Sequence, residues 1–136
     1  MQTRPIIRAL PGADAAGHGE GWGSNAQIAA IENIDRQLAR LLDALDRAGL
    51  RTSTAIIVSA DHGGAGHTHG PDDARSRHIP WIIAGPGVKQ GYDLTQQAEL
   101  EVRTEDTAAT VCYLLGLPQR DYFDGKPVLA AFGDTG

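Results

Sequence analysis

Several features are scarce or absent in this sequence, and each absence excludes a class of protein. Cys112 is the one cysteine among the 136 residues, so the chain forms no internal disulfide. Cys112 falls within an apolar helical pattern, which predicts a small residue of the core. No stretch of about 18 apolar residues occurs, so the sequence predicts no membrane-spanning helix.

Signals for export and for binding to polyanions are also missing. The first 20 residues show no basic segment followed by an apolar one, so no signal peptide is predicted and the cellular location is left open. The net charge is −5 without a block of basic residues, so we expect neither nucleic acid nor a membrane as a partner. Hydrophobic residues make up 41 % of the chain and charged residues 21 %, which is typical of a folded domain.

The spacing of apolar residues predicts an α/β fold with a parallel-type sheet flanked by helices. Residues 25–48 form an amphipathic helix pattern that follows Ser24, a good N-cap residue. Residues 54–60 are a continuous apolar run, typical of a strand buried on both faces. No linker is visible, so residues 1–136 are expected to belong to one domain. The other predicted elements are a strand over residues 4–10, a glycine-rich loop over 11–24, a polar loop over 71–77, a strand over 79–84, a helix over 104–115, and a turn with a short packing segment over 121–132.

Two pairs of an acid and a histidine stand where a metal site is expected. Asp14 and His18 are four residues apart, a spacing that lets both side chains turn toward one ion. Asp61 and His62 follow the strand predicted at 54–60, and the glycines after them allow the backbone to aim both at one centre. Carboxylate and imidazole donors without thiolate suit zinc, manganese or iron better than calcium.

Two further histidines extend the second pair, and some of the acids and histidines also have a structural explanation. His67 and His69 are two residues apart and could share a face. Asp61 alone could cap a turn, and a single histidine in a loop, such as His18, is commonly solvated. His78, beside a predicted strand and without an acidic neighbour, is interpreted as structural.

Other kinds of catalytic site find little support. No Gly-x-Ser-x-Gly turn occurs, so the sequence predicts no serine nucleophile of that type. The glycines of residues 63–66 lead into histidines and not into a helix, which argues against a dinucleotide site. Two clusters of carboxylate and imidazole at one sheet edge therefore favour a metal site.

The candidate ligands stand within a longer series of motifs. Asp14-x-x-x-His18 precedes Gly-Trp-Gly-Ser at residues 21–24, Asp61-His62 ends a strand, and His69-Gly70 precedes Ile-Pro-Trp-Ile-Ile-Ala-Gly-Pro-Gly at residues 79–87. Through these motifs, between residues 13 and 132, the sequence resembles the alkaline phosphatase superfamily. The resemblance is greatest to its type I phosphodiesterase/nucleotide pyrophosphatase branch.

The resemblance implies a metal-dependent hydrolase of phosphate esters that uses two divalent ions, zinc or alternatively manganese. Asp14, His18 and His69 would hold one ion, with His67 as the alternative to His69. Asp61 and His62 would supply part of the shell of the other ion. The implied substrate is a small-molecule phosphoester.

The resemblance also implies that part of the catalytic centre is missing. The family's nucleophile, a Thr or Ser, and a further Asp ligand belong to an N-terminal half that has no match in this sequence. Residues 1–136 are therefore expected to be the C-terminal part of an alkaline-phosphatase-like domain, without a catalytic nucleophile and with negligible activity alone. The alternatives are a non-catalytic remnant or a subunit that depends on a partner such as the missing half. Within the enzyme class, sulfatases and cofactor-independent phosphoglycerate mutases share the Asp-His core.

Overall fold

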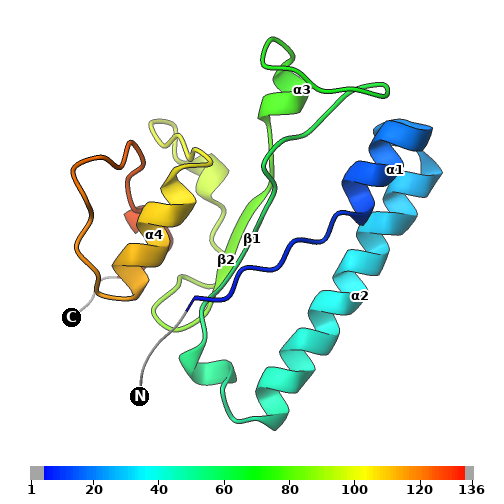
Figure 1. Cartoon of the computed structure of the whole chain (residues 1–136). Helices are drawn as coiled ribbons and strands as arrows, with labels where there is room; N and C mark the ends of the chain where they lie inside the picture. The colour runs from blue at the N-terminus through cyan, green and yellow to red at the C-terminus, as the bar shows by residue number, and fades with distance from the viewer. Residues whose placement is uncertain (1–4, 134–136) are drawn as a thin grey trace. The chain divides into compact units, whose positions relative to one another are not determined.

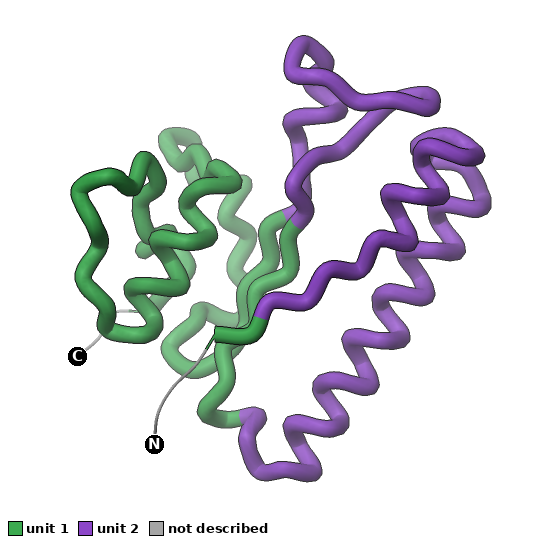
Figure 2. The backbone as a smooth tube through the Cα atoms, viewed as in Figure 1, with its two compact units in different colours: residues 1–6, 52–59, 81–136 green, residues 7–51, 60–80 purple. Residues whose placement is uncertain are grey.

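The computed structural model describes residues 5–133 (Figure 1). These residues form two compact units. The helical unit consists of residues 7–51 and 60–80 (Figure 2). The sheet unit contains residues 52–59 and 81–133 together with residues 5–6. All the predicted metal ligands belong to the helical unit, so their positions relative to one another can be compared within a single unit.

The helical unit begins with α1 (Gly12–Glu20), which lies alongside α2 (Figure 1). The prediction of a loop over residues 11–24 is wrong for this part. Glycine lowers helix propensity by about 1 kcal/mol relative to alanine, but packing against α2 offsets this cost. Gln27 of α2 is buried and donates a hydrogen bond to the carbonyl of Ala13, at 3.4 Å. Gly17 is buried where a Cβ atom would lie 2.8 Å from the indole of Trp22, so packing selects glycine there.

The long helix α2 (Asn25–Arg47) confirms the prediction over residues 25–48. The hydroxyl of Ser24 accepts a hydrogen bond from the backbone N–H of Gln27 at 3.2 Å, as expected for an N-cap. The helix ends before Gly49, whose φ of +67° is a conformation that favours glycine. The same unit contains a single helical turn, α3 (Ala74–Arg77), within the segment predicted as a polar loop.

The sheet unit contains β1 (Ile56–Ser59) and β2 (Trp81–Ala84), which pair antiparallel with Ile56 opposite Ala84. The predicted strands over 54–60 and 79–84 are therefore confirmed in place and are shorter than expected. The predicted parallel sheet is not what residues 5–133 form, because these two strands run in opposite directions.

The strand predicted over residues 4–10 is wrong for residues 5–10, which have no regular structure, and Arg4 lies outside the described residues. Ile6 and Ile7 are 84 % and 93 % exposed, so their apolar side chains gain little from burial. Pro5 has no N–H to give to a neighbouring strand. These two apolar residues, which suggested the strand, therefore pack little against other parts of the described chain.

Helix α4 (Asp106–Leu114) confirms the helix predicted over residues 104–115 and organises the core of the sheet unit. The carboxylate of Asp106 accepts hydrogen bonds from the backbone N–H groups of Arg103 and Lys126, at 2.8 and 2.7 Å. Cys112 is half-buried within this helix.

The packing segment predicted near the end of the chain is confirmed. Val128 and Phe132 are buried on either side of a short 3₁₀ turn, η3 (Leu129–Ala131), and form the core with Ala131. The remaining 3₁₀ turns are η1 (Arg51–Ser53) and η2 (Leu94–Gln96). Within residues 5–133, no helix combines the length and the apolar character needed to cross a bilayer.

Candidate metal centre

Helix α1 presents the first acid–histidine pair on one face. Asp14 and His18 are one helical turn apart, and Asp14 Oδ1 lies 3.5 Å from His18 Nε2. Both side chains are about half exposed, at 51 % and 45 %. The helix therefore places the two donors side by side, which a loop of the same spacing does not guarantee.

The segment after β1 brings the second pair to the same place. His62 Nε2 lies 3.8 Å from Asp14 Oδ1 and 3.9 Å from Asp61 Oδ2. The side chain of Asp61 is 90 % exposed, so it stands at the outer edge of the cluster. Residues 48 positions apart in the sequence, Asp14 and His62, are thus neighbours in the helical unit.

The last two histidines take different places. The ring of His69 stacks on that of His62, with centroids 3.7 Å apart and 18° between the planes. It also lies 5.3 Å from the ring of His18. His67 instead donates a hydrogen bond from Nδ1 to the backbone carbonyl of His18, at 3.1 Å. Of the two histidines left open by the sequence, His69 is the one in ring contact with the other candidate ligands.

Backbone carbonyls determine which nitrogen of each key imidazole is free. Nδ1 of His18 lies 3.0 Å from the carbonyl of His67, and Nδ1 of His62 lies 2.9 Å from the carbonyl of Gly63. A carbonyl only accepts, so each Nδ1 must carry the hydrogen. In the neutral ring, Nε2 then has a free lone pair, and both Nε2 atoms face the carboxylate of Asp14. An imidazole whose other N–H is bonded to a carbonyl is the usual arrangement of a metal-ligating histidine.

Trp22 lies among the imidazoles, a role that the sequence analysis missed. Its ring centroid is 4.8 Å from that of His18, 6.1 Å from that of His69 and 6.4 Å from that of His62. A Cβ atom on Gly64 would overlap the indole directly, so this glycine is required for close approach. The signal in the sequence was the pair of glycines that follows Asp61-His62, interpreted there only as freedom of the backbone.

Ser76 in α3 accepts hydrogen bonds from both ends of the loop that carries His67 and His69. The sequence analysis also missed this role of Ser76. The backbone N–H of Gly63 donates to the carbonyl of Ser76 at 2.7 Å, and that of Gly70 donates to its hydroxyl at 3.0 Å. Asp73 caps α3, and hydrogen bonds from the side chain and then the backbone of Arg75 hold the pKa of the Asp73 carboxyl below its ordinary value. The single turn of α3 thus supports the histidine-bearing loop.

The donors fit a divalent ion in kind and in proximity. Carboxylate oxygen and imidazole nitrogen are ligands of zinc and manganese, and the 3.5 Å between Asp14 Oδ1 and His18 Nε2 is near the spacing between two ligands of one ion. Among residues 5–133, no three His, Cys, Asp or Glu side chains are arranged to hold an ion as they stand. An ion would therefore need some of these side chains, such as the stacked rings of His62 and His69, to turn toward it.

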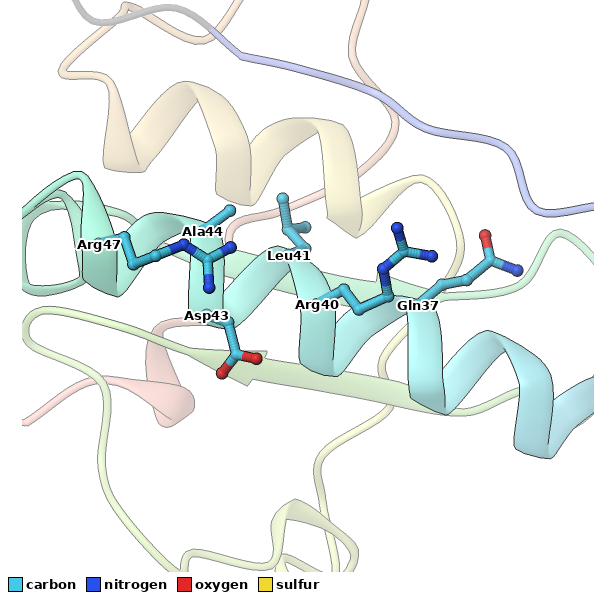
Figure 3. Close-up of a pocket in the computed structure, with 6 residues that line it drawn as sticks. All are labelled: Gln37, Arg40, Leu41, Asp43, Ala44 and Arg47. Carbon is cyan, nitrogen blue, oxygen red and sulfur yellow. The ribbon is translucent and has the colours of Figure 1, made fainter.

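A hollow of about 590 Å³ runs along α2 and is separate from this cluster in its residues (Figure 3). Its lining comes from one helix and mixes basic, acidic and apolar side chains: Gln37, Arg40, Leu41, Asp43, Ala44 and Arg47. None of the candidate ligands belongs to it, so we assign it no part in the metal centre.

The cluster defines a candidate divalent-metal site built from carboxylate and imidazole. The chain belongs to the type I phosphodiesterase/nucleotide pyrophosphatase family, whose model matches residues 6–75. The matched segment contains every candidate ligand, from Asp14 to His69.

Known proteins similar to this chain come from several branches of the alkaline phosphatase superfamily. A 2,3-bisphosphoglycerate-independent phosphoglycerate mutase of Nostoc punctiforme is 33 % identical over 77 % of the chain. Arylsulfatase K of Danio rerio is 30 % identical over 74 % of it, and a phosphopentomutase of Herpetosiphon aurantiacus is 31 % identical over 66 %. The chain spans about a fifth of the length of these relatives, since the matches cover 20 % of each.

Proposed function

We propose that this chain supplies ligands to a two-metal centre that hydrolyses phosphate esters, of the phosphodiesterase and nucleotide pyrophosphatase kind. Asp14, His18 and His69 hold one divalent ion, zinc or alternatively manganese. Asp61 and His62 provide part of the shell of the second ion. The chain is the C-terminal part of an alkaline-phosphatase-like domain. The nucleophile does not come from residues 1–136 and is supplied by the missing N-terminal half.

The observation that carries this proposal is the convergence of two imidazoles on one carboxylate. Nε2 of His18 and Nε2 of His62 lie 3.5 and 3.8 Å from the same oxygen of Asp14. The hydrogen bonds at their Nδ1 atoms leave both Nε2 lone pairs free in the neutral rings. Ligands of two ions are expected to meet in this way, because the metals of two-metal phosphotransfer sites are about 3.5–4 Å apart.

The residues of this chain would orient and confine the centre. When bound, such ions polarise a phosphoryl oxygen and lower the pKa of an attacking hydroxyl or water. Trp22 packs against the ring of His18, and Ser76 holds one end of the loop that carries His69, so both restrict where these imidazoles can lie. Without a nucleophile, these residues alone are expected to turn over phosphodiesters negligibly.

The names of the relatives bear on the substrate. They include mutases that act on phosphorylated compounds and an arylsulfatase, so the shared chemistry is transfer at a tetrahedral phosphorus or sulfur centre. The family match favours a phosphate ester over a sulfate ester.

The proposal is tested first by metal binding to the 136-residue chain. Calorimetric titration with Zn²⁺ or Mn²⁺ should show weak but saturable binding. Asp14→Asn and His62→Ala should each reduce the affinity at least tenfold, and His78→Ala, which removes an exposed histidine outside the cluster, should not. Absence of binding in the unmodified chain would favour a non-catalytic remnant.

A second experiment examines turnover. With zinc or manganese added, the chain should hydrolyse bis(4-nitrophenyl) phosphate and 4-nitrocatechol sulfate negligibly. Robust phosphodiester hydrolysis that EDTA and Asp61→Ala both abolish would contradict the part of the proposal that places the nucleophile elsewhere. Turnover of the sulfate ester alone would contradict the proposed substrate class.

A further inference from the structure

His18 and His67 form a reciprocal pair across the helical unit. Nδ1 of His18 bonds to the carbonyl of His67 at 3.0 Å, and Nδ1 of His67 bonds to the carbonyl of His18 at 3.1 Å. The two residues are 49 positions apart, one on α1 and the other in the loop before His69. Each residue therefore uses its side chain to hold the backbone of the other.

This pairing places His67 differently from the other histidines of the cluster. Since the carbonyl of His18 is only an acceptor, Nδ1 of His67 carries the hydrogen. The opposite edge of the ring lies beside Gly21, where Nε2 and Cε1 are 3.8 and 3.7 Å from the position that a Cβ atom would occupy. His69, two residues further on, instead meets the rings of His18 and His62.

The pair also determines how His18 presents its nitrogen to Asp14. The carbonyl of His67 fixes the hydrogen of His18 on Nδ1, which leaves Nε2, on the side facing Asp14, without a hydrogen and with its lone pair free in the neutral ring. Every amino acid at position 67 has a carbonyl, but the imidazole of His67 is what ties that carbonyl to α1. A separate hydrogen bond, from the N–H of Trp22 to the carbonyl of Gly66 at 2.7 Å, holds the same loop and does not involve the side chain of His67.

We propose that His67 is a positioning residue, which keeps His18 in the Nδ1–H form with Nε2 free for a metal, and that His67 is not itself a ligand. The metal part of this inference rests on the proposed function. The tautomer part does not, because it concerns the protein without an ion. Donation of the second ring N–H to a backbone carbonyl is a common support for metal-ligating histidines, and loss of such support typically weakens metal affinity about 10–100-fold.

The test compares His67→Ala with His67→Asn in the full chain. The asparagine amide nitrogen is attached to Cγ as Nδ1 is, so His67→Asn retains a donor to the carbonyl of His18. His78→Asn is the matched control for loss of an exposed imidazole. Long-range ¹H–¹⁵N spectra of the metal-free proteins report the tautomer of His18, and zinc titration reports the affinity.

We expect His18 to be in the Nδ1–H form in the unmodified chain and in His67→Asn, and to be a mixture of tautomers in His67→Ala. Zinc affinity should fall about tenfold in His67→Ala and recover in His67→Asn. An unchanged tautomer in His67→Ala would overturn the inference, as would equal loss of zinc in both variants, which would make His67 a ligand. If the unmodified chain binds no zinc, the proposed function fails, and the tautomer still decides whether His67 positions His18.

Discussion

The imidazoles of His62 and His69 stack face to face, 3.7 Å apart at their centroids and with 18° between their planes. The intervening loop returns on itself, with Ala65 and Thr68 bonded through their backbones in both directions. In the proposed centre these two rings serve different ions. This contact must therefore open before each ring can turn toward its own ion.

Zinc is expected to separate this stack. Each ring must turn a nitrogen toward its own ion, and stacked rings cannot do so without moving apart. We expect the ring proton signals of His62 and His69 to lose their mutual ring-current shift on addition of zinc, as followed by NMR. The signals of His78 serve as the internal control. Saturation with zinc that moves the signals of His18 and leaves the stack unchanged would contradict the assignment of both residues.

Gly64→Ala should displace Trp22 and weaken metal binding. The added Cβ atom would overlap the indole, so the ring must leave its position among the histidines. We expect about a tenfold loss of zinc affinity, comparable with loss of other supporting contacts. Gly70→Ala is the matched control, because a Cβ atom there meets nothing within 4 Å. Equal zinc affinity in the two variants would show that Trp22 does not support the cluster.

Ser76→Ala should loosen one end of the histidine-bearing loop. The variant removes the hydroxyl that accepts from the N–H of Gly70, while the carbonyl that accepts from Gly63 remains. Loss of one hydrogen bond costs about 1 kcal/mol, so exchange of the Gly70 amide hydrogen should become roughly fivefold faster. Thr68→Ala removes an exposed hydroxyl of the same loop whose bond to the carbonyl of His69 is long, at 3.4 Å, and should change this exchange rate less than Ser76→Ala does.

Acid should weaken α3 through Asp73. Hydrogen bonds from Arg75 hold the pKa of the Asp73 carboxyl below its ordinary value, so the carboxylate stabilises the folded state above the unfolded pKa. This contribution is lost as pH falls through the folded pKa, below about pH 4. Protection of the Arg75 amide from exchange should decline there, and Asp73→Asn should remove that dependence on pH.

A second aspartate provides the control for this titration. Asp93 in the sheet unit has its pKa lowered by hydrogen bonds from Thr95 and Gln96. Asp93→Asn should therefore leave the acid-dependent loss at Arg75 intact. The interpretation is wrong if Asp73→Asn and the unmodified chain lose protection over the same pH range.

Thr110→Val should destabilise the sheet unit strongly, although threonine and valine have side chains of nearly the same size. The hydroxyl of Thr110 is fully buried, donates to the carbonyl of Asp106 at 2.7 Å and accepts from the N–H of Val128 at 3.0 Å. Valine leaves that N–H buried without a partner, at a cost of about 1–3 kcal/mol. Urea unfolding of the full chain measures the change. Thr110→Ser, which keeps the hydroxyl, should lose less stability than Thr110→Val.

Local patterns sufficed for the elements that their own residues stabilise. The helix at 25–48 was predictable because its apolar spacing, the cap at Ser24 and the glycine at 49 lie within one segment. The strands β1 and β2 were also predictable, because each lies within a short apolar run of the sequence. Helix α1 was not, because its glycines disfavour a helix and its stability comes from contact with Gln27 and Trp22.

The candidate site divides in the same way. The identity and spacing of Asp14, His18, Asp61 and His62 pointed to carboxylate and imidazole donors at two places in the chain. Ser76 had no equivalent signal, because a serine that is buried and bonded in the structure cannot be told from other serines of a polar segment by its sequence. Trp22 was visible as part of a motif, but its contacts with three histidines were not.

The sequence by itself determined the family and the elements with strong local periodicity, and it predicted carboxylate and imidazole donors for the candidate site. The tertiary structure decided that residues 12–20 are helical, that β1 and β2 run antiparallel, and that His69 and not His67 meets the other rings. Spacing along a segment limits which of its residues can share a face. Whether His67 bonds to a residue 49 positions away depends on packing between segments, which no local pattern records.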